Sequence, residues 1–350
     1  MSLKKLNRIA LLALLTISAA SCKDDDETTS LPQLSGLTFS CPAYVMPEHT
    51  VKMTPRGTVH PDDGGIGYHW KVTPSMSKSD TTRLENGLSP DGKESDGSFT
   101  FTFSDTLGKY NVTCYAFASG HTGDAHSITV NVVKGGIDGS ITNTGIAGED
   151  PNFVSDGQTY YYTTIGGTDW LRRNISDSSC GVAYFNCEAA SDVFGRYYSH
   201  EEAMNVCPEG WRLPTEDEWI ELCKAVGAAD AERLSSVSGV TSKLMANAYF
   251  NDMLMTEYWP EVGEITNDSK LSLIPSGFAN LGNGRDGSYP DATFEGMDKY
   301  AVVWTADVVE NEEGMAYYRY IINDQPDLMI GKGDRKSFGA SVRCVRSNAQ

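Results

Sequence analysis

The sequence has few cationic residues and only one long apolar run. Lys and Arg number 28 against 47 Asp and Glu, which gives a formal net charge of −19. Such a chain repels a polyanion, so the composition argues against a nucleic-acid partner. After residue 20 no apolar stretch is long enough to span a bilayer as a helix. Apolar residues still make up 40% of the 350 residues, which excludes a largely disordered chain.

Several catalytic motifs are also missing. The sequence has neither a Gly-rich phosphate-binding loop nor a Gly-x-Ser-x-Gly elbow, so nucleotide binding and serine-hydrolase chemistry have no support. His200-Glu201 could open a zinc-protease motif, but Met204 stands where the second histidine is required. The other histidines are scattered before residue 127 without the spacing of metal ligands.

The N-terminus has the order of an export signal. Three cationic residues precede an apolar run from Ile9 to Ala20, as in a signal peptide. The run ends in Ala-Ser-Cys22, which resembles the lipobox of bacterial lipoproteins and implies cleavage before Cys22 and lipidation of its thiol. We expect a signal peptide over residues 1–21 and an acidic tether over residues 22–30.

The tether indicates where the anchored protein lies. Lys23 and the four acidic residues after it resemble the export signal that sends lipoproteins of Bacteroidetes-type bacteria to the outer face of the outer membrane. We therefore expect an outer-membrane lipid anchor with display on the cell surface. Retention on the periplasmic face is the alternative, because charge runs are often only solvated linkers.

Residues 31–134 alternate apolar and polar positions in short runs separated by turn residues. A period of two at this spacing predicts an antiparallel β-sandwich. The expected strands are Thr50–Val59, Gly67–Thr73, Ser98–Phe103, Lys109–Ala118 and Ser127–Val133. Gly67–Val72 and Asp105–Thr113 resemble strand pairs of immunoglobulin-like domains of the polycystic-kidney-disease (PKD) type, a resemblance that implies an immunoglobulin/PKD-like spacer domain.

A linker and a second domain are expected next. Gly135-Gly136 and the polar residues that follow predict a linker over residues 135–155, and the second domain is expected over residues 156–350. Two capping boxes predict helix starts, at Ser199 with Glu202 and at Thr215 with Glu218. The second helix carries an apolar stripe up to Gly227, so one of its faces is predicted to be buried.

Many separated motifs in this second domain occur in the order of one known family. They are Cys207-Pro208-Glu209-Gly210-Trp211-Arg212-Leu213-Pro214-Thr215, Glu218-Trp219, Ser276-Gly277-Phe278, Trp304-Thr305 and Ser341-Val342-Arg343-Cys344-Val345. From Asp156 to Arg346 the chain resembles the Fibrobacter succinogenes major paralogous domain, a family whose function is largely unassigned. The order of elements also resembles the C-type-lectin-like fold, which formylglycine-generating enzymes share. The expected fold class is thus multidomain: an all-β immunoglobulin/PKD-like sandwich followed by an α+β C-type-lectin-like domain.

Disulfides are permitted in an exported protein. Seven cysteines remain if Cys22 is lipidated, so at least one thiol stays free or pairs between chains. The lectin-like resemblance implies a bridge between Cys207 and Cys344. Cys223 lies on the apolar stripe of a predicted helix, where a buried, inert thiol is expected.

Two more bridges are possible by position. Cys180 and Cys187 are separated by a length that suits a hairpin loop. Cys41 and Cys114 would tie strands of the first domain, although Cys41 lies early for the usual partner between sheets.

A stretch rich in Gly, Asn and Asp lies between residues 280 and 291. C-type lectins bind calcium through carboxylate and amide oxygens of a long loop, so this stretch could hold calcium, although its composition also fits ordinary turns. We expect no other cofactor. Nearby aromatic side chains could face a ligand. The candidate ligand-binding residues are Trp259, Asn280, Asn283, Arg285, Asp286, Tyr289 and Asp291.

Three functions remain open from the sequence. The first is a non-enzymatic, lipid-anchored surface protein that recognises a glycan or a protein partner through loops of the lectin-like domain. The second is a structural or assembly component of the envelope without a small ligand. The third is a hydrolase or modifying enzyme, which would need a pocket with two facing carboxylates. An exposed polar cleft favours the first function and a large flat apolar patch favours the second.

Overall fold

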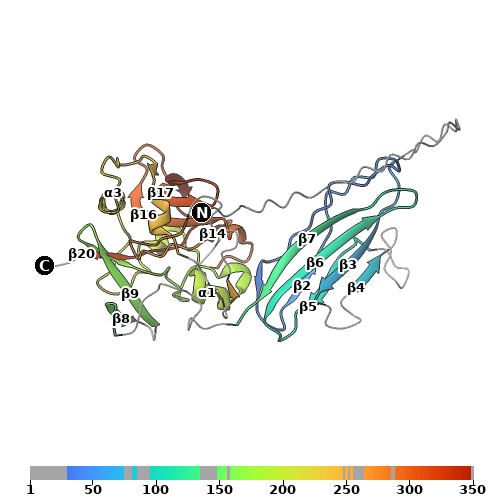
Figure 1. Ribbon diagram of the computed structural model, residues 1–350, viewed down its shortest axis with the longest axis horizontal. Helices are drawn as coiled ribbons and strands as arrows, with labels where there is room; N and C mark the ends of the chain where they lie inside the picture. The colour runs from blue at the N-terminus through green and yellow to red at the C-terminus, as the bar shows by residue number, and fades with distance from the viewer. Residues whose placement is uncertain are drawn as a thin grey trace, which may run out of the picture.

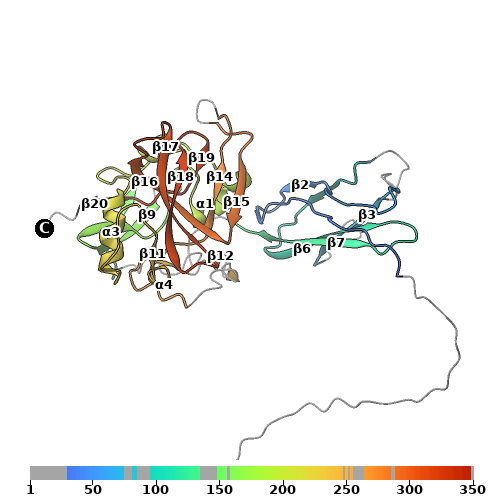
Figure 2. The ribbon, with the colours of Figure 1, turned by 90° about the horizontal axis from the view of Figure 1, so that it is seen from above.

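The computed structural model describes residues 30–74, 81–84, 95–134, 148–155, 158–246, 249–250, 253–254, 264–284 and 288–347. Two units lie end to end along the longest axis, one over residues 30–134 and the other over residues 148–347 (Figures 1 and 2). Both are built mainly of strands, which confirms a β-rich multidomain protein. None of the helices in the described part of the chain is both long and apolar enough to cross a bilayer. The expected signal peptide, with Cys22 and most of the tether, lies outside the described residues.

The N-terminal unit consists of two sheets that pack face to face. The five-stranded sheet has the order β1-β7-β6-β3-β4, and the second sheet pairs β2 with β5. The strands are β1 (Tyr44–Val45), β2 (Thr50–Met53), β3 (Gly67–Thr73), β4 (Thr81–Leu84), β5 (Phe99–Thr102), β6 (Gly108–Phe117) and β7 (Asp124–Val132). All five strands predicted from alternation are present, because alternate side chains of β2 and β5 turn into one core with those of β3, β6 and β7.

Strand β2 is shorter than predicted. It ends at Met53, because Pro55 lacks an N–H and Gly57 has a φ of +73°. The residues beyond it form only isolated bridges, Arg56 with Thr38 and Val59 with Ser35.

The C-terminal unit contains a four-stranded sheet, a larger mixed sheet and a small hairpin. The first sheet has the order β20-β10-β9-β8, and the larger one has the order β11-β18-β17-β16-β14-β15 with β19 beside β14. The strands are β8 (Asn152–Ser155), β9 (Gln158–Ile165), β10 (Thr168–Leu171), β11 (Val237–Ser238), β12 (Tyr249–Phe250), β13 (Met253–Leu254), β14 (Ser276–Asn280), β15 (Thr293–Met297), β16 (Tyr300–Val308), β17 (Met315–Ile322), β18 (Asp327–Asp334), β19 (Phe338–Gly339) and β20 (Val345–Ser347).

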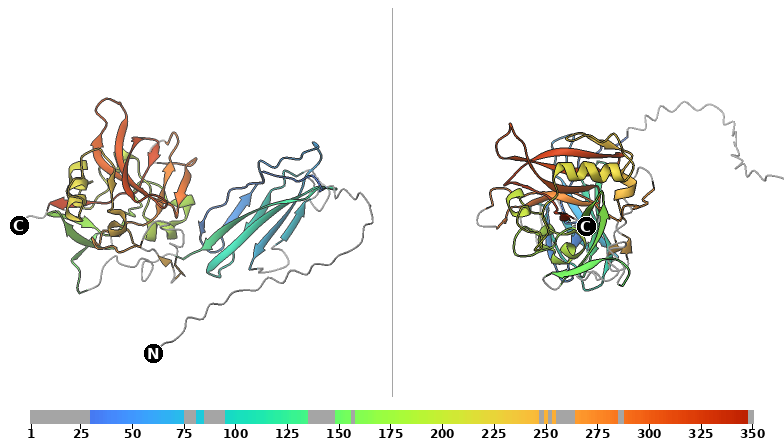
Figure 3. Two further views of the ribbon diagram at one scale, coloured as in Figure 1. Left: turned by 45° about the horizontal axis from the view of Figure 1, so that its top comes forward. Right: turned by 90° about the vertical axis from the view of Figure 1, so that its left-hand side faces the viewer.

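Short helices complete this unit. They are η2 (Tyr184–Asn186), α1 (Glu188–Phe194), α2 (His200–Ala203), α3 (Glu216–Ala225) and α4 (Thr241–Leu244). Both predicted capping boxes are confirmed: Ser199 and Thr215 each accept from the backbone N–H three residues on, and the glutamate there reaches back. The stripe on α3 is buried against the larger sheet, and Figure 3 shows the helix lying beside its strands.

Arg343 fastens three segments of this unit together. Its guanidinium is buried and donates to Asn174 Oδ1 at 2.9 and 3.1 Å and to the carbonyl oxygens of Leu171, Leu271 and Ser272. Burial lowers the pKa of Arg343 to about 9. The side chain therefore joins the C-terminal segment to the end of β10 and to the 271–272 loop.

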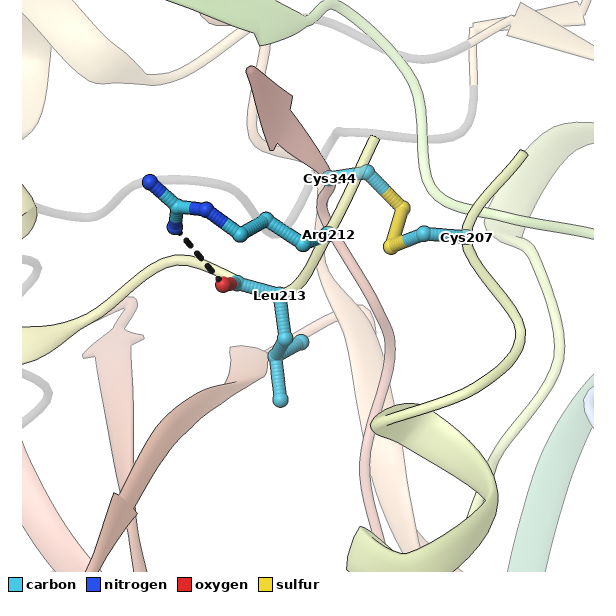
Figure 4. The surroundings of a disulfide bond; sticks show 4 residues. All are labelled: Cys207, Arg212, Leu213 and Cys344. Atoms are coloured by element: carbon cyan, nitrogen blue, oxygen red, sulfur yellow. Dashed lines mark hydrogen bonds between the residues drawn. A yellow bond between two sulfur atoms is a disulfide. The ribbon is translucent and has the colours of Figure 1, made fainter. Parts of the chain in front are cut away.

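The disulfide implied by the resemblance is present. Cys207 and Cys344 are bonded and join segments 137 residues apart in the chain. Figure 4 shows the bridge beside Arg212 and Leu213, where the Arg212 guanidinium donates to the Leu213 carbonyl oxygen at 3.3 Å. Arg212 also bonds Val345 through its backbone, so the bridge and this pairing hold the C-terminal strand in one place.

The other two expected disulfides are wrong. Cys180 and Cys187 are free thiols. Helix η2 separates them, and each packs in a different cluster, Cys180 beside Tyr198 and Cys187 beside Tyr184. The separation of the two cysteines suits a hairpin loop, but the chain between them forms helix η2 instead.

Cys41 and Cys114 are also free thiols. Strand β7 lies between β1, which follows Cys41, and β6, which carries Cys114. Two strand spacings amount to about 10 Å, beyond the roughly 7 Å that a disulfide spans between Cα atoms. Cys223 is buried on α3 as expected, and burial raises the pKa of its thiol to about 12.

The two units share a buried joint. Tyr44 of β1 packs between Tyr184 and Phe194 of the C-terminal unit, and its hydroxyl donates to Asp298 Oδ1 at 2.6 Å. The Tyr184 hydroxyl in turn accepts from the Ala43 N–H at 3.1 Å. These contacts belong to one cluster drawn from both units, so the joint is packed rather than loosely tethered.

The joint predicts a specific pH dependence. Burial raises the pKa of Asp298 to about 7, although Tyr44 and Lys109 partly oppose the shift. The folded protein therefore holds this proton more tightly than the unfolded chain, whose value is 3.8. The stabilisation is complete below that value and is lost as the pH rises through about 7. The groups facing the carboxyl also include Tyr184 and Tyr197.

We expect Asp298→Asn to remove this contribution. The difference in free energy of unfolding between wild type and variant should shrink steadily from pH 4 to pH 7, as measured by urea denaturation at several pH values. Other carboxyl groups, such as Asp96 and Asp334 with their lowered pKa values, also make stability depend on pH. Their contributions are the same in both proteins and cancel when the free energy of the variant is subtracted from that of the wild type. Parallel pH profiles for the two proteins would show that Asp298 does not titrate in this window.

Candidate functional site

A hollow of about 660 Å³ lies on the C-terminal unit. Its walls come from segments far apart in the sequence: the 177–180 turn, the start of α2, and residues near Gly284 and Lys336. Tyr289 contributes an aromatic ring to the wall and is half-buried. The hollow is therefore a polar cleft with one aromatic face.

The capping box of α2 forms the floor beside this ring. The Glu202 carboxylate accepts from the Ser199 N–H and hydroxyl, both at 2.9 Å, and from the Gly181 N–H at 3.2 Å. Burial and the nearby Glu202 carboxylate raise the pKa of Tyr289 to about 12, although Ser199 opposes the shift. Tyr289 therefore stays a neutral phenol at physiological pH, and Glu202 is occupied by structural hydrogen bonds.

Other polar groups in the hollow make fewer hydrogen bonds within the protein than Glu202 does. Asp177 accepts from the Ser179 N–H at 2.7 Å, as in an Asx turn. Glu201 is exposed, and its carboxylate has no partner among the described residues. Asn205 is exposed too, and Lys336 brings one positive charge to the opposite wall. Because three carboxylates meet one ammonium group, the hollow is acidic and rich in hydrogen-bond acceptors.

Gly284 is needed where the loop meets the ring. A Cβ placed on Gly284 would lie 2.3 Å from Cδ1 of Tyr289, a distance that no side chain tolerates. The loop backbone therefore passes directly against Tyr289 and fixes the position of its ring.

The structure unites part of the predicted loop site. Asn283 and Asp291 line a smaller hollow of about 390 Å³, and Gly284 lines both this hollow and the larger one. Asn280 instead ends β14, where its Oδ1 accepts from the Gly282 N–H at 3.0 Å, an ordinary turn contact. Trp259, Arg285 and Asp286 lie outside the described residues.

Sequence reasoning did not identify the walls that face Tyr289. Asp177 and Ser179 lie in a loop without a known motif, Glu201 and Glu202 belong to the predicted helix start, and Asn205 belongs to no motif of the sequence. The polar residues Asp177, Ser178 and Ser179 are the signal in the sequence that could have indicated this wall. Its neighbours in space are more than 20 residues away, which a local pattern does not reveal.

The described residues give no metal cluster. No group of three or more His, Cys, Asp and Glu side chains comes together in them. His200, which opens α2, uses both ring nitrogens within the protein: Nε2 contacts the Thr305 carbonyl oxygen at 3.0 Å and Nδ1 accepts from Arg335 Nε at 3.3 Å. Burial lowers the pKa of His200, which favours the neutral ring. His200 is therefore a structural residue in this geometry.

Comparison with known proteins agrees with the motifs in the C-terminal unit. The Fibrobacter succinogenes major domain family matches residues 163–346, more than half of the chain. The matched region includes the larger hollow, both helices with capping boxes and the disulfide. A search of curated proteins finds no match to the chain. By this match the chain belongs to the Fibrobacter succinogenes major domain family.

Proposed function

We propose that the protein is a lipid-anchored receptor on the surface of a Bacteroidetes-type bacterium that binds a glycan without cleaving it. The ligand would occupy the hollow beside Tyr289 in a C-type-lectin-like C-terminal domain, which an immunoglobulin/PKD-like N-terminal domain carries. The observation that supports this most is the meeting of an aromatic face with free acceptors at Glu201 and Asn205. Sugars offer hydroxyl donors and an apolar C–H face, which such a surface complements.

Two features favour a glycan over a protein partner. The larger hollow is concave and polar. The exposed large apolar side chains among the described residues belong to both units and to different elements, as Tyr115, Val154 and Met204 illustrate. Isolated apolar residues of this kind are normal on a protein surface and do not make a flat interface.

Binding is favoured over hydrolysis by the state of the carboxylates. A glycosidase needs two carboxyl groups free to act on one bond. Of the three in the hollow, Glu202 accepts three hydrogen bonds within the protein and Asp177 holds its own turn. Glu201 alone has none among the described residues, so the hollow supplies one free carboxylate.

A glycan array probed with residues 31–350 tests the proposal. We expect selective binding of a small set of glycans, measured once with calcium and once with a chelator. Loss of binding with the chelator would place calcium in the loop that carries Asn283 and Asp291, and persistent binding would place recognition in the hollow alone. Absence of binding in both conditions contradicts the glycan proposal and favours a protein partner.

Tyr289→Ala should weaken the binding of any array ligand about fivefold, because an aromatic contact contributes on the order of 1 kcal/mol. The matched control is Tyr115→Ala, which removes an exposed ring from β6 of the other unit. Chromatography of the ligand after incubation serves as a separate readout, since cleavage products would favour the hydrolase hypothesis instead.

A further inference from the structure

A second hollow lies at the joint between the two units. It has a volume of about 420 Å³, within the usual range of roughly 300–1,000 Å³ for small-ligand sites. The N-terminal unit supplies one wall through β2 and the residues before it, and the C-terminal unit supplies the other through η2 and the start of β15. Neither unit alone forms this cavity, and the packed joint at Tyr44 holds the two walls together.

The two hollows have opposite charge. Among the described residues no Asp or Glu lines the joint hollow, although acidic residues number 47 of 350 in the chain. Lys52 and His49 line it instead, both exposed. Among the described residues Lys52 forms an ion pair with Asp96 at 3.9 Å, and because both side chains are more than half exposed this ion pair is weak. The Lys52 ammonium is thus available to an anionic ligand in a strongly acidic protein.

The opposite wall is aromatic. Phe185 and Phe294 lie with ring centroids 4.9 Å apart, and both rings are half-buried, so part of each faces the cavity. Tyr289 lies between the two hollows and lines both.

The backbone that carries this wall is strained. Phe185 has a φ of +44° and Asn186 has a φ of +57°, a left-handed conformation that is unfavourable for a residue with a Cβ. Packing of Phe185 on Tyr184, at 4.9 Å between centroids, holds it there. The strain has a clear structural result, because it directs the Phe185 ring to the wall of the cavity.

We propose that the joint hollow binds a carboxylated saccharide. The carboxylate would pair with Lys52 and the His49 ring, while the C–H face of the sugar would lie against Phe185 and Phe294. The N-terminal unit is then half of a binding site and more than a spacer. This site is distinct from the acidic hollow of the proposed function, because Lys52 and Phe185 do not line that hollow.

Isothermal titration of residues 31–350 with trigalacturonate tests this proposal. We expect saturable one-to-one binding, and binding at least tenfold weaker for the trimethyl ester, which keeps the sugar rings and removes the charge. Lys52→Gln should weaken trigalacturonate binding about tenfold or more, since a charge-assisted hydrogen bond contributes roughly 1.5–3 kcal/mol. Lys71→Gln, an exposed lysine on β3 outside the hollow, should leave the affinity unchanged.

Further measurements test the aromatic contact, the charged contact and the preference for a saccharide separately. Phe185→Leu keeps an apolar side chain and removes the flat face, so it should weaken trigalacturonate several-fold. Equal binding of acid and ester, or an unchanged affinity in Lys52→Gln, would overturn the charged contact. Competition by inorganic sulfate at the same concentration as trigalacturonate would show a simple anion site and overturn the saccharide. Absence of trigalacturonate binding would overturn the whole proposal, and it would leave the proposed function standing, because Glu201 and Asn205 line only the acidic hollow.

Discussion

Replacing Arg319 with methionine is expected to lower the free energy of unfolding by about 3–5 kcal/mol. Arg319 lies in the middle of β17 and forms a fully buried pair with Glu216, the first residue of α3. Its Nε and Nη2 donate to the Glu216 carboxylate at 3.0 and 2.6 Å, and its Nη1 donates to the Ser235 carbonyl oxygen at 2.7 Å. The variant leaves a carboxylate with no exposed surface and without its hydrogen-bonded counter-charge, so the loss exceeds that of an ordinary surface pair.

The double variant distinguishes a stranded charge from lost packing. Arg319→Met combined with Glu216→Gln should be more stable than Arg319→Met alone, because the buried negative charge is gone. Urea denaturation of residues 31–350 measures both. A cost below about 1 kcal/mol for the single variant, or a double variant no better than the single, would mean that water reaches Glu216 and that the pair does not anchor α3 to the sheet.

Removing the disulfide is the second large change. Cys207→Ala with Cys344→Ala should lower the free energy of unfolding by about 2–5 kcal/mol, since the bridge closes a loop of 137 residues in the unfolded chain. Both cysteines are replaced so that no new free thiol is introduced. The wild-type protein should lose the same amount in dithiothreitol, and the double variant should not respond to it.

Cys180→Ser provides the matched control for the disulfide. Cys180 is a half-buried free thiol, so this variant should keep the stability and the dithiothreitol response of the wild type. If Cys180→Ser abolished the dithiothreitol response, the bridge would involve Cys180 and the pairing described here would be wrong.

The parts that could be predicted from sequence are those with a local signature. Alternation predicted β3 and β6, because Trp70 and Val72 of β3, and Tyr110, Val112, Cys114 and Ala116 of β6, are buried at alternate positions. The capping boxes located the starts of α2 and α3, since Ser199 and Thr215 act within three residues of their partners.

The parts that could not be predicted depend on contacts between distant segments. No local pattern in the sequence indicates that the Arg343 guanidinium bonds Asn174, which lies 169 residues earlier. The same holds for the hydrogen bond between Tyr44 and Asp298, which brings the two units into one core. Spacing along the chain also misled the pairing of Cys180 with Cys187, because a turn of helix intervenes.

The candidate site was predicted in part for the same reason. Composition pointed to the loop with Asn283, Tyr289 and Asp291, which the structure places along two adjoining hollows. The wall that faces Tyr289 comes from residues 177–180 and from α2, whose sequence features describe only turns and caps. The charge contrast between the acidic hollow and the joint hollow appears only when both units are in place.

The proposed function requires a glycan to occupy the acidic hollow. Hydrogen–deuterium exchange of residues 31–350, with and without the strongest ligand from the array, tests it most directly. We expect slower exchange in the peptides that carry Ser179, Glu202 and Tyr289, and unchanged exchange in β3 and β6 of the N-terminal unit. Protection confined to other segments, with those three peptides unaffected, would contradict it.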